Sequence, residues 1–191
     1  HFLQKSVNNF TAYIQYYYLR NDKKGLINFV LSNPLDTSKY NSSDLALAYS
    51  RMGEVFTENS LNKDAEFYFA KAIQLMPFVI NYKIKYGSFL IKTESLKKAK
   101  IIFNSALNMN PTIKEVHLNL GYIAILNRDF EMAESRLKQA IALNPDYILA
   151  YENLVLSAQM QKKKGDVKVY LNKILEIVPA HKAKQILENL K

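Results

Sequence analysis

Four of the five prolines in this chain stand at a constant spacing of 34 residues: Pro77, Pro111, Pro145 and Pro179. A fixed spacing of this length indicates that one helix–turn–helix unit is repeated along the chain. Proline lacks an amide N–H and disfavours helix at the residue before it, so each proline is expected to end the second helix of its unit. The chain is therefore predicted to be an all-α array of helix pairs.

Aligning the prolines at position 32 of a 34-residue unit gives four units, which begin at Ala46, Ile80, Lys114 and Ile148. Position 8 carries Gly53, Gly87, Gly121 and Val155; position 20 carries Ala65, Ala99, Ala133 and Val167; position 27 carries Ala72, Ala106, Ala140 and Ile174. Position 24 carries a large apolar residue: Phe69, Phe103, Leu137 and Leu171. Small residues let two helices approach closely, and the large residue fills the space beside the contact. The columns predict a tightly packed antiparallel pair in each unit.

This pattern resembles the tetratricopeptide repeat family over residues 46–181. The third unit carries the resemblance most clearly, through His117, Leu120-Gly121, Ala124, Ala133, Leu137, Ala140 and Asn144-Pro145. The fourth unit departs from it, with Val155, Val167 and Ile174 where small residues are usual. The resemblance implies a right-handed superhelical helix–turn–helix solenoid of four repeats, at 46–79, 80–113, 114–147 and 148–181.

Residues 1–45 are predicted to form an N-terminal helical pair, either a cap or a degenerate repeat. Residues 2–20 carry one apolar stripe at helical spacing, and a second, short helix is predicted over Leu26–Leu31. If Pro34 is taken as the end of a further unit, the residues before it align poorly with the small-residue columns of the four repeats. We therefore favour a capping pair.

The segment 33–43 is rich in Ser, Asn and Asp and is predicted to be a loop, with Ser43 or Asp44 capping the next helix. Ser95 and Asp129 are predicted to cap the second helices of the second and third repeats. Residues 182–191 are predicted to form a C-terminal capping helix, because apolar residues are available there to cover the last repeat.

Residue types that carry catalysis or bind metals are sparse in this chain. It has no cysteine and three dispersed histidines, and His117 falls at a packing position of the third repeat. Five glycines form no phosphate-binding motif. We therefore expect no enzyme activity, no metal, no cofactor and no small-molecule substrate.

The sequence leaves the compartment open. The chain begins with His1 rather than Met, which indicates a processed or trimmed chain or a part of a larger protein. No apolar run of 18 residues occurs, so membrane association through this segment is not expected.

The net charge of +9 is concentrated in the second repeat. That repeat contains a single acidic residue, Glu94, and six lysines: Lys83, Lys85, Lys92, Lys97, Lys98 and Lys100. Specific nucleic-acid recognition favours Arg, whose planar group binds phosphates and bases in a bidentate manner, and the basic residues here are mostly Lys. We favour a solvated Lys surface and keep RNA or polyanion binding as an alternative.

The family resemblance implies that the first helices of successive repeats line a concave groove, mainly through positions 2, 5, 6, 9, 12 and 13. The predicted groove residues are Arg51, Glu54, Lys85, Ser88, Leu118, Asn119, Tyr122, Asn153 and Leu156. They change from charged to amide and apolar along the chain. The amides suit the backbone of an extended peptide, since they both donate and accept hydrogen bonds. Arg51 and Lys85 suit acidic side chains.

One variant of the family binds the C-terminal carboxylate of heat-shock chaperones through Lys at position 5 and Asn at position 9 of its first clamp repeat. The two positions hold Ser50 and Glu54 in the first repeat, Ile84 and Ser88 in the second, and Leu118 and Tyr122 in the third. The clamp is therefore absent, and a chaperone tail is not the expected partner.

These observations favour a non-catalytic protein–protein interaction scaffold that binds an extended or helical partner segment in the groove. Two alternatives stay open: a regulatory or positioning domain of a larger enzyme, an envelope-associated one included, and RNA or polyanion binding through the Lys-rich second repeat. Self-association also stays open, because exposed faces at the ends of an array can stack.

Overall fold

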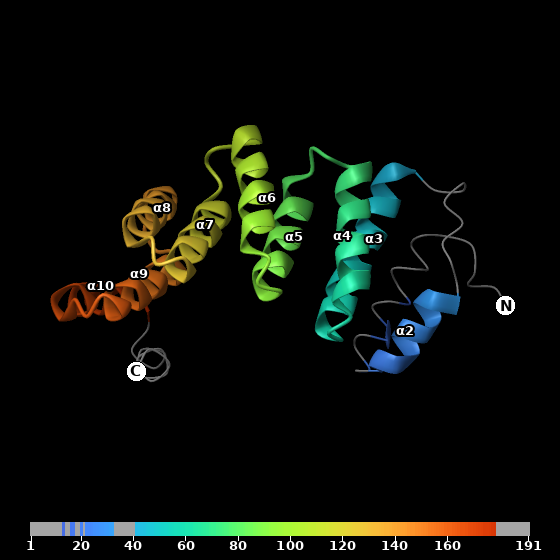
Figure 1. Cartoon of the computed structure of the whole chain (residues 1–191), viewed down its shortest axis with the longest axis horizontal. Helices are drawn as coiled ribbons and strands as arrows, with labels where there is room; N and C mark the ends of the chain where they lie inside the picture. Colours follow the sequence, from blue (N-terminus) through green and yellow to red (C-terminus); the bar gives the residue numbers. More distant parts are fainter. Residues whose placement is uncertain (1–12, 14–15, 18–19, 21, 33–40, 179–191) are drawn as a thin grey trace. The chain divides into compact units, whose positions relative to one another are not determined.

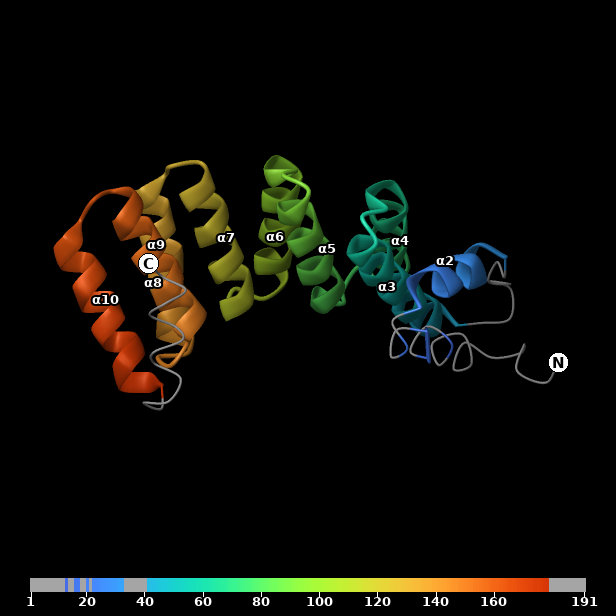
Figure 2. The same cartoon turned by 90° about the horizontal axis from the view of Figure 1, so that it is seen from below.

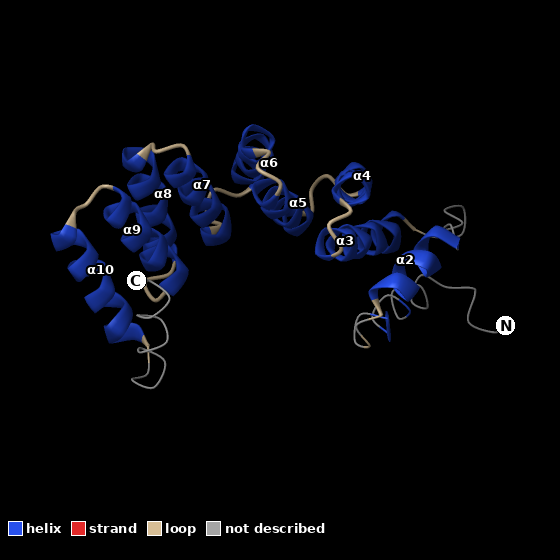
Figure 3. Cartoon of the chain, turned by 60° about the horizontal axis from the view of Figure 1, so that its bottom comes forward, coloured by secondary structure: helices blue, strands red, loops and turns tan. Residues whose placement is uncertain are grey.

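The computed structural model describes residues 13, 16–17, 20, 22–32 and 41–178, and every regular element in these residues is an α-helix (Figures 1 and 3). The helices are α2 (Lys23–Ser32), α3 (Ser42–Glu58), α4 (Asn62–Leu75), α5 (Ile80–Lys92), α6 (Leu96–Met109), α7 (Lys114–Leu126), α8 (Phe130–Leu143), α9 (Ile148–Met160) and α10 (Lys164–Ile177). The chain divides into two compact units, residues 1–102 and 103–191, and the division falls inside α6.

The helices follow the 34-residue spacing of the prolines. The first helices α5, α7 and α9 begin at Ile80, Lys114 and Ile148, and the second helices α4, α6, α8 and α10 begin at Asn62, Leu96, Phe130 and Lys164. Each second helix ends two residues before its proline, as α8 does at Leu143 before Pro145. The prediction that proline ends the second helix is therefore confirmed.

A tight turn joins the two helices of each pair, and one residue in it has a left-handed backbone. These residues are Ser60, Glu94, Arg128 and Lys162, with φ of 61°, 57°, 59° and 59°. In the turn between α7 and α8, the Arg128 N–H bonds to the Ile125 carbonyl and the Asp129 N–H to the Ala124 carbonyl, both at 2.9 Å. The other three turns repeat this pattern. The turn therefore satisfies carbonyls that the end of the first helix would otherwise leave unpaired.

In the first unit, α3 and α4 lie side by side, and α5 packs against both (Figure 1). A Cβ at Gly53 of α3 would lie 2.8 Å from the ring of Phe69 in α4, so the small residue is what permits this approach. The Phe69 ring centroid lies 5.4 Å from that of Phe89 in α5, which extends the core from one repeat to the next. The predicted roles of positions 8 and 24 are thus confirmed here.

The second unit uses the same packing. Figure 2 shows α7 beside α8 and α9 beside α10. A Cβ at Gly121 would lie 2.8 Å from Leu137 Cγ, and Leu137 is fully buried. In the last pair, Val155 and Ile174 are both fully buried although they stand in small-residue columns. Larger side chains therefore fill the interface between α9 and α10.

The helix starts test the predicted caps. Asp129 caps α8, because its carboxylate accepts from the Met132 N–H at 3.2 Å. The prediction for α3 is wrong: Asn41, not Ser43 or Asp44, is the cap, and its side-chain oxygen accepts from the Asp44 N–H at 2.9 Å. The helix begins at Ser42, two or three residues earlier than expected, so Asp44 stands in its first turn, where a negative charge interacts favourably with the helix dipole.

The chain ends are described in part. Helix α2 contains the predicted short helix over residues 26–31 and begins three residues before it. Most of the predicted helix over 2–20, residues 33–40 of the predicted loop and the predicted capping helix over 182–191 lie outside the described residues. The predicted division into a cap, four repeats and a second cap therefore stays a prediction.

Candidate functional site

Within each unit the first helices of successive repeats are neighbours, α3 with α5 and α7 with α9. The predicted groove residues accordingly fall into two sets. The first-unit set is Arg51 and Glu54 on α3 with Lys85 and Ser88 on α5; the second-unit set is Leu118, Asn119 and Tyr122 on α7 with Asn153 and Leu156 on α9. The structure thus places the members of each set on two adjacent helices.

The charged residues of the first-unit set already bind one another. The Glu54 carboxylate forms an ion pair with the Lys85 ammonium on the neighbouring helix, and a second one with Arg51 at 3.5 Å on its own helix. The side chain of Arg51 is 51% exposed, against 25% for Lys85. Two cations therefore share one carboxylate, and the sequence did not predict this arrangement.

Position 5 behaves differently from the expectation in the first repeat. Ser50 is fully buried, and its hydroxyl oxygen has no hydrogen-bond partner among the described residues. This position therefore contributes to the core of the first unit and is not part of an exposed surface on α3.

The second-unit set combines amide and apolar groups, all of them half-buried. The Asn119 amide nitrogen donates to the Glu115 carbonyl one turn earlier at 2.7 Å, which leaves its amide oxygen as an acceptor for another molecule. Leu118 and Leu156 pack at the edge of the hydrophobic core that α7, α8 and α9 share. Beside Asn153, burial raises the pKa of the Glu152 carboxyl. This surface is thus less charged than that of the first unit.

Three of the six lysines in the second repeat are buried or form ion pairs within the first unit. Lys83 is only 9% exposed, Lys85 pairs with Glu54, and Lys98 pairs with Glu66 at 2.9 Å. The hydrogen bond from Lys98 holds the pKa of the Glu66 carboxyl below its usual range. The other lysines of this repeat, Lys92, Lys97 and Lys100, are exposed.

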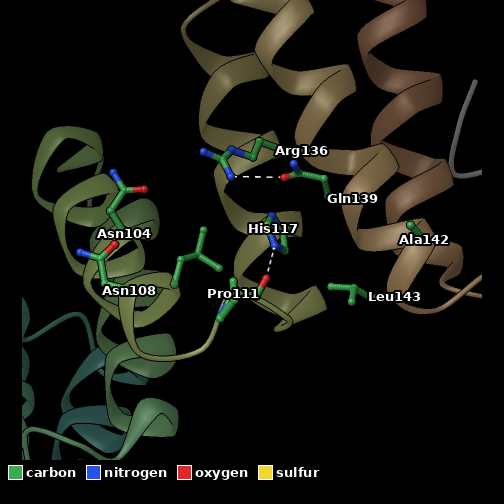
Figure 4. A pocket seen from close by; sticks show the side chains of 9 residues that line it. Asn104, Asn108, Pro111, His117, Arg136, Gln139, Ala142 and Leu143 are labelled. Carbon is green, nitrogen blue, oxygen red and sulfur yellow. Dashed lines mark hydrogen bonds between the residues drawn. The ribbon is translucent and has the colours of Figure 1, made fainter.

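A pocket of about 570 Å³ opens in the second unit, and none of the predicted groove residues lines it. It lies between the C-terminal half of α6 and helix α8, with His117 of α7 between them (Figure 4). His117 is 6% exposed and its Nε2–H donates to the Pro111 carbonyl at 2.8 Å, so its predicted packing role is confirmed. No sequence motif predicted this pocket.

Among the described residues, no group of three His, Asp or Glu side chains lies close enough together to hold a metal ion. None of the helices in this described part combines the length and the apolar character that a membrane span requires.

Comparison with known sequences identifies one repeat directly. Residues 114–147 match the family model of the tetratricopeptide repeat. Over 122 residues the chain is 28% identical to cilia- and flagella-associated protein 70 of Homo sapiens. The aligned part covers 64% of this chain but 11% of that protein, so the chain corresponds to a small part of this relative.

Solved structures share the fold over almost the whole chain. MamA (residues 41 to the end) from Desulfovibrio magneticus RS-1 superposes with a TM-score of 0.72 at 15% identity, covering 90% of this chain and 94% of that one. YrrB, described as a tetratricopeptide repeat protein with an unusual peptide-binding site, gives 0.66 at 19% identity, covering 96% and 92%. At these identities the likeness concerns the fold alone.

Proposed function

We propose that this chain, whose residues 114–147 match the tetratricopeptide repeat family model, is a scaffold that binds an extended or helical segment of a partner protein along its first helices. Repeat arrays of this kind present long surfaces formed by neighbouring repeats, and these are their usual binding surfaces. A structural neighbour, YrrB, is described as having a peptide-binding site. A protein partner is therefore the occupant that the fold favours.

The observation that carries this proposal is the adjacency of α7 and α9 in the second unit. Tyr122 on α7 and Asn153 on α9 occupy the repeat positions that Glu54 and Lys85 occupy in the first unit, where the two side chains meet across the helices. The amide of Asn153 and the free oxygen of Asn119 can bond to a peptide backbone, and Tyr122 offers an aromatic face with a polar end.

The test is affinity capture from an extract of the source organism, followed by cross-linking to map the contact. Two variants remove the surfaces separately: Tyr122→Ala with Asn153→Ala in the second unit, and Arg51→Ala with Lys85→Ala in the first. A control, Lys97→Ala with Lys100→Ala, removes two exposed charges on the second helix α6, outside the predicted groove. We expect partners to be lost with one or both groove variants and retained with the control.

The proposal fails if both groove variants retain every partner that the wild type retains. Equal loss with the control variant would also count against it, since this would indicate general electrostatic attraction. Thermal melts of each variant, followed by circular dichroism, distinguish lost contacts from lost folding.

Polyanion binding is a weaker proposal, because three lysines of the second repeat are buried or paired. It predicts that binding of homopolymeric RNA falls steeply between low and physiological salt, with a slope set by the number of phosphates contacted. A role as the positioning domain of a larger enzyme is a further proposal. It predicts that a catalytic domain is encoded in the same polypeptide, which the complete reading frame would show.

A further inference from the structure

The pocket in the second unit lies between two second helices, away from the proposed binding surface on α7 and α9. Asn104 and Asn108 project from α6 on one side, and Arg136 and Gln139 project from α8 on the other (Figure 4). Its volume of about 570 Å³ falls within the range of about 300–1,000 Å³ that is usual for ligand pockets.

The pocket lies where a histidine and an arginine occupy two repeat positions that hold tyrosine one repeat later. Position 4 is His117 in α7 but Tyr151 in α9, and position 23 is Arg136 in α8 but Tyr170 in α10. Tyr151 and Tyr170 pack against the hydrophobic core of the second unit. The space that aromatic side chains fill at that junction is open between α6 and α8, where polar side chains lie beside apolar ones such as Leu107 and Leu143.

A buried histidine, His117, lines the pocket between the two helices. His117 donates from Nε2 to the Pro111 carbonyl, so Nδ1 carries a lone pair. That Nδ1 atom is buried and has no hydrogen-bond partner among the described residues. Buried polar atoms are rarely left unpaired in folded proteins, so this ring atom is an exception in the packing beside the pocket.

Arg136 gives the pocket a positive charge that the described residues do not neutralise. Its Nη1 donates to the Gln139 amide oxygen at 3.2 Å, and no carboxylate of residues 103–178 lies within ion-pair distance of it. By contrast, Lys138 on the same helix pairs with Glu134 at 2.8 Å. The remaining N–H groups of Arg136 are suited to a carboxylate, which a guanidinium binds with two parallel hydrogen bonds.

We propose that this pocket is a second binding site, which takes a short acidic peptide segment in extended conformation. The ligand's carboxylate pairs with Arg136, and its backbone amides bond to the side-chain amides of Asn104 and Asn108, which donate and accept as a peptide does. The carboxylate comes either from an Asp or Glu side chain or from a C-terminus. Since the site uses the second helices, one chain can hold two segments at once.

The test uses the full chain and four pools of fluorescein-labelled tetrapeptides. The pools carry either Asp and Glu or Asn and Gln at their two central positions, each with a free or an amidated C-terminus. Fluorescence anisotropy gives the affinity for each pool. We expect at least one carboxylate-containing pool to bind more tightly than the amidated Asn/Gln pool, and the pool that does so identifies the source of the carboxylate.

Variants then locate the binding. Arg136→Gln should weaken it about tenfold or more, because a hydrogen bond to a charged group is lost. Arg128→Gln makes the same change of charge at an exposed turn of the same unit and should leave affinity within about twofold. Asn108→Leu should weaken binding, because it removes the side-chain amide that bonds to the ligand backbone. Tyr122→Ala with Asn153→Ala should not affect it.

Three results would overturn the proposal. In the first, no carboxylate-containing pool binds the wild type better than the amidated Asn/Gln pool. In the second, Arg128→Gln weakens binding as much as Arg136→Gln does. Loss of binding in the Tyr122 and Asn153 variant would also overturn it, and would assign the peptide to the first-helix surface.

Discussion

The four inter-helix turns predict that glycine should stabilise this chain at four matched positions. Ser60, Glu94, Arg128 and Lys162 all have φ between 57° and 61°, and all are exposed. A left-handed backbone costs a residue with a Cβ roughly 1–2 kcal/mol, because the Cβ crowds the following carbonyl. Glycine avoids this cost but loses about 0.5–1 kcal/mol of chain entropy on folding relative to Ala. The difference favours glycine by about 0.5–1 kcal/mol at each site.

We therefore expect Arg128→Gly to raise the free energy of unfolding by about 0.5–1 kcal/mol, and the fourfold variant to raise it by about 2–4 kcal/mol if the sites are independent. Stability in repeat arrays is close to a sum over repeats and their interfaces, which supports additivity. The assay is urea unfolding followed by circular dichroism at 222 nm, in which the midpoint moves at constant slope.

The control is Asn127→Gly, one residue earlier in the same turn, where φ is −82°. There glycine relieves no strain and only adds entropy to the unfolded chain, so stability should stay level or fall. The reasoning would be refuted if Arg128→Gly and Asn127→Gly lowered the urea midpoint equally. An unchanged midpoint in the fourfold variant would refute it as well.

Further predictions concern two buried serines, two helical glycines and one tyrosine. Ser50→Ala should stabilise the chain by about 1 kcal/mol, because a buried unpaired hydroxyl is removed. Ser157→Ala should cost stability in the same urea titration, because the hydroxyl of Ser157 accepts from Gln161 at 3.3 Å. Gly165→Ala in α10 should add up to about 1 kcal/mol, since no atom lies within 4 Å of the new Cβ. Gly121→Ala should instead lower the thermal midpoint, because the Cβ would lie 2.8 Å from Leu137. Burial, assisted by the Glu66 carboxylate, raises the pKa of Tyr86 to about 12, so its contribution to stability is present below pH 10 and lost as the pH rises through 12. A titration at 295 nm should show that Tyr86→Phe removes a component of the tyrosine absorbance that ionises near pH 12.

The periodic columns predicted those parts of the fold that depend on contacts within one repeat. Gly53 and Phe69, like Gly121 and Leu137, are 16 residues apart and meet in the folded pair, so their spacing alone carries the information. The prolines fix helix ends for a similar reason, because proline acts on the residue just before it. The cap of α3 was missed since several adjacent residues, Asn41 included, can all serve as caps, and local sequence does not choose between them.

Contacts between repeats were harder to predict. The ion pair of Glu54 with Lys85 depends on how two side chains from neighbouring repeats lean toward each other, which the columns do not encode. The pocket beside Arg136 depends on volume that is missing, not on a motif. A comparison of position 4 across the repeats, where His117 stands against Tyr151, contains a signal for it. This difference predicts a pocket only when α6 and α8 are known to lie on either side of the His117 ring.

Glu54 has a consequence for the choice of partner. A carboxylate attached to the same chain is present near Arg51 and Lys85 at a very high effective concentration, so it acts as a built-in competitor. A single acidic residue from outside gains little by replacing it, because one ion pair is exchanged for another. A segment with several closely spaced acidic residues can displace Glu54 from both cations and form additional ion pairs. The choice of partner at this surface would thus depend on the density of negative charge in the partner segment. Glu54→Gln would lower the number of acidic residues that the segment needs.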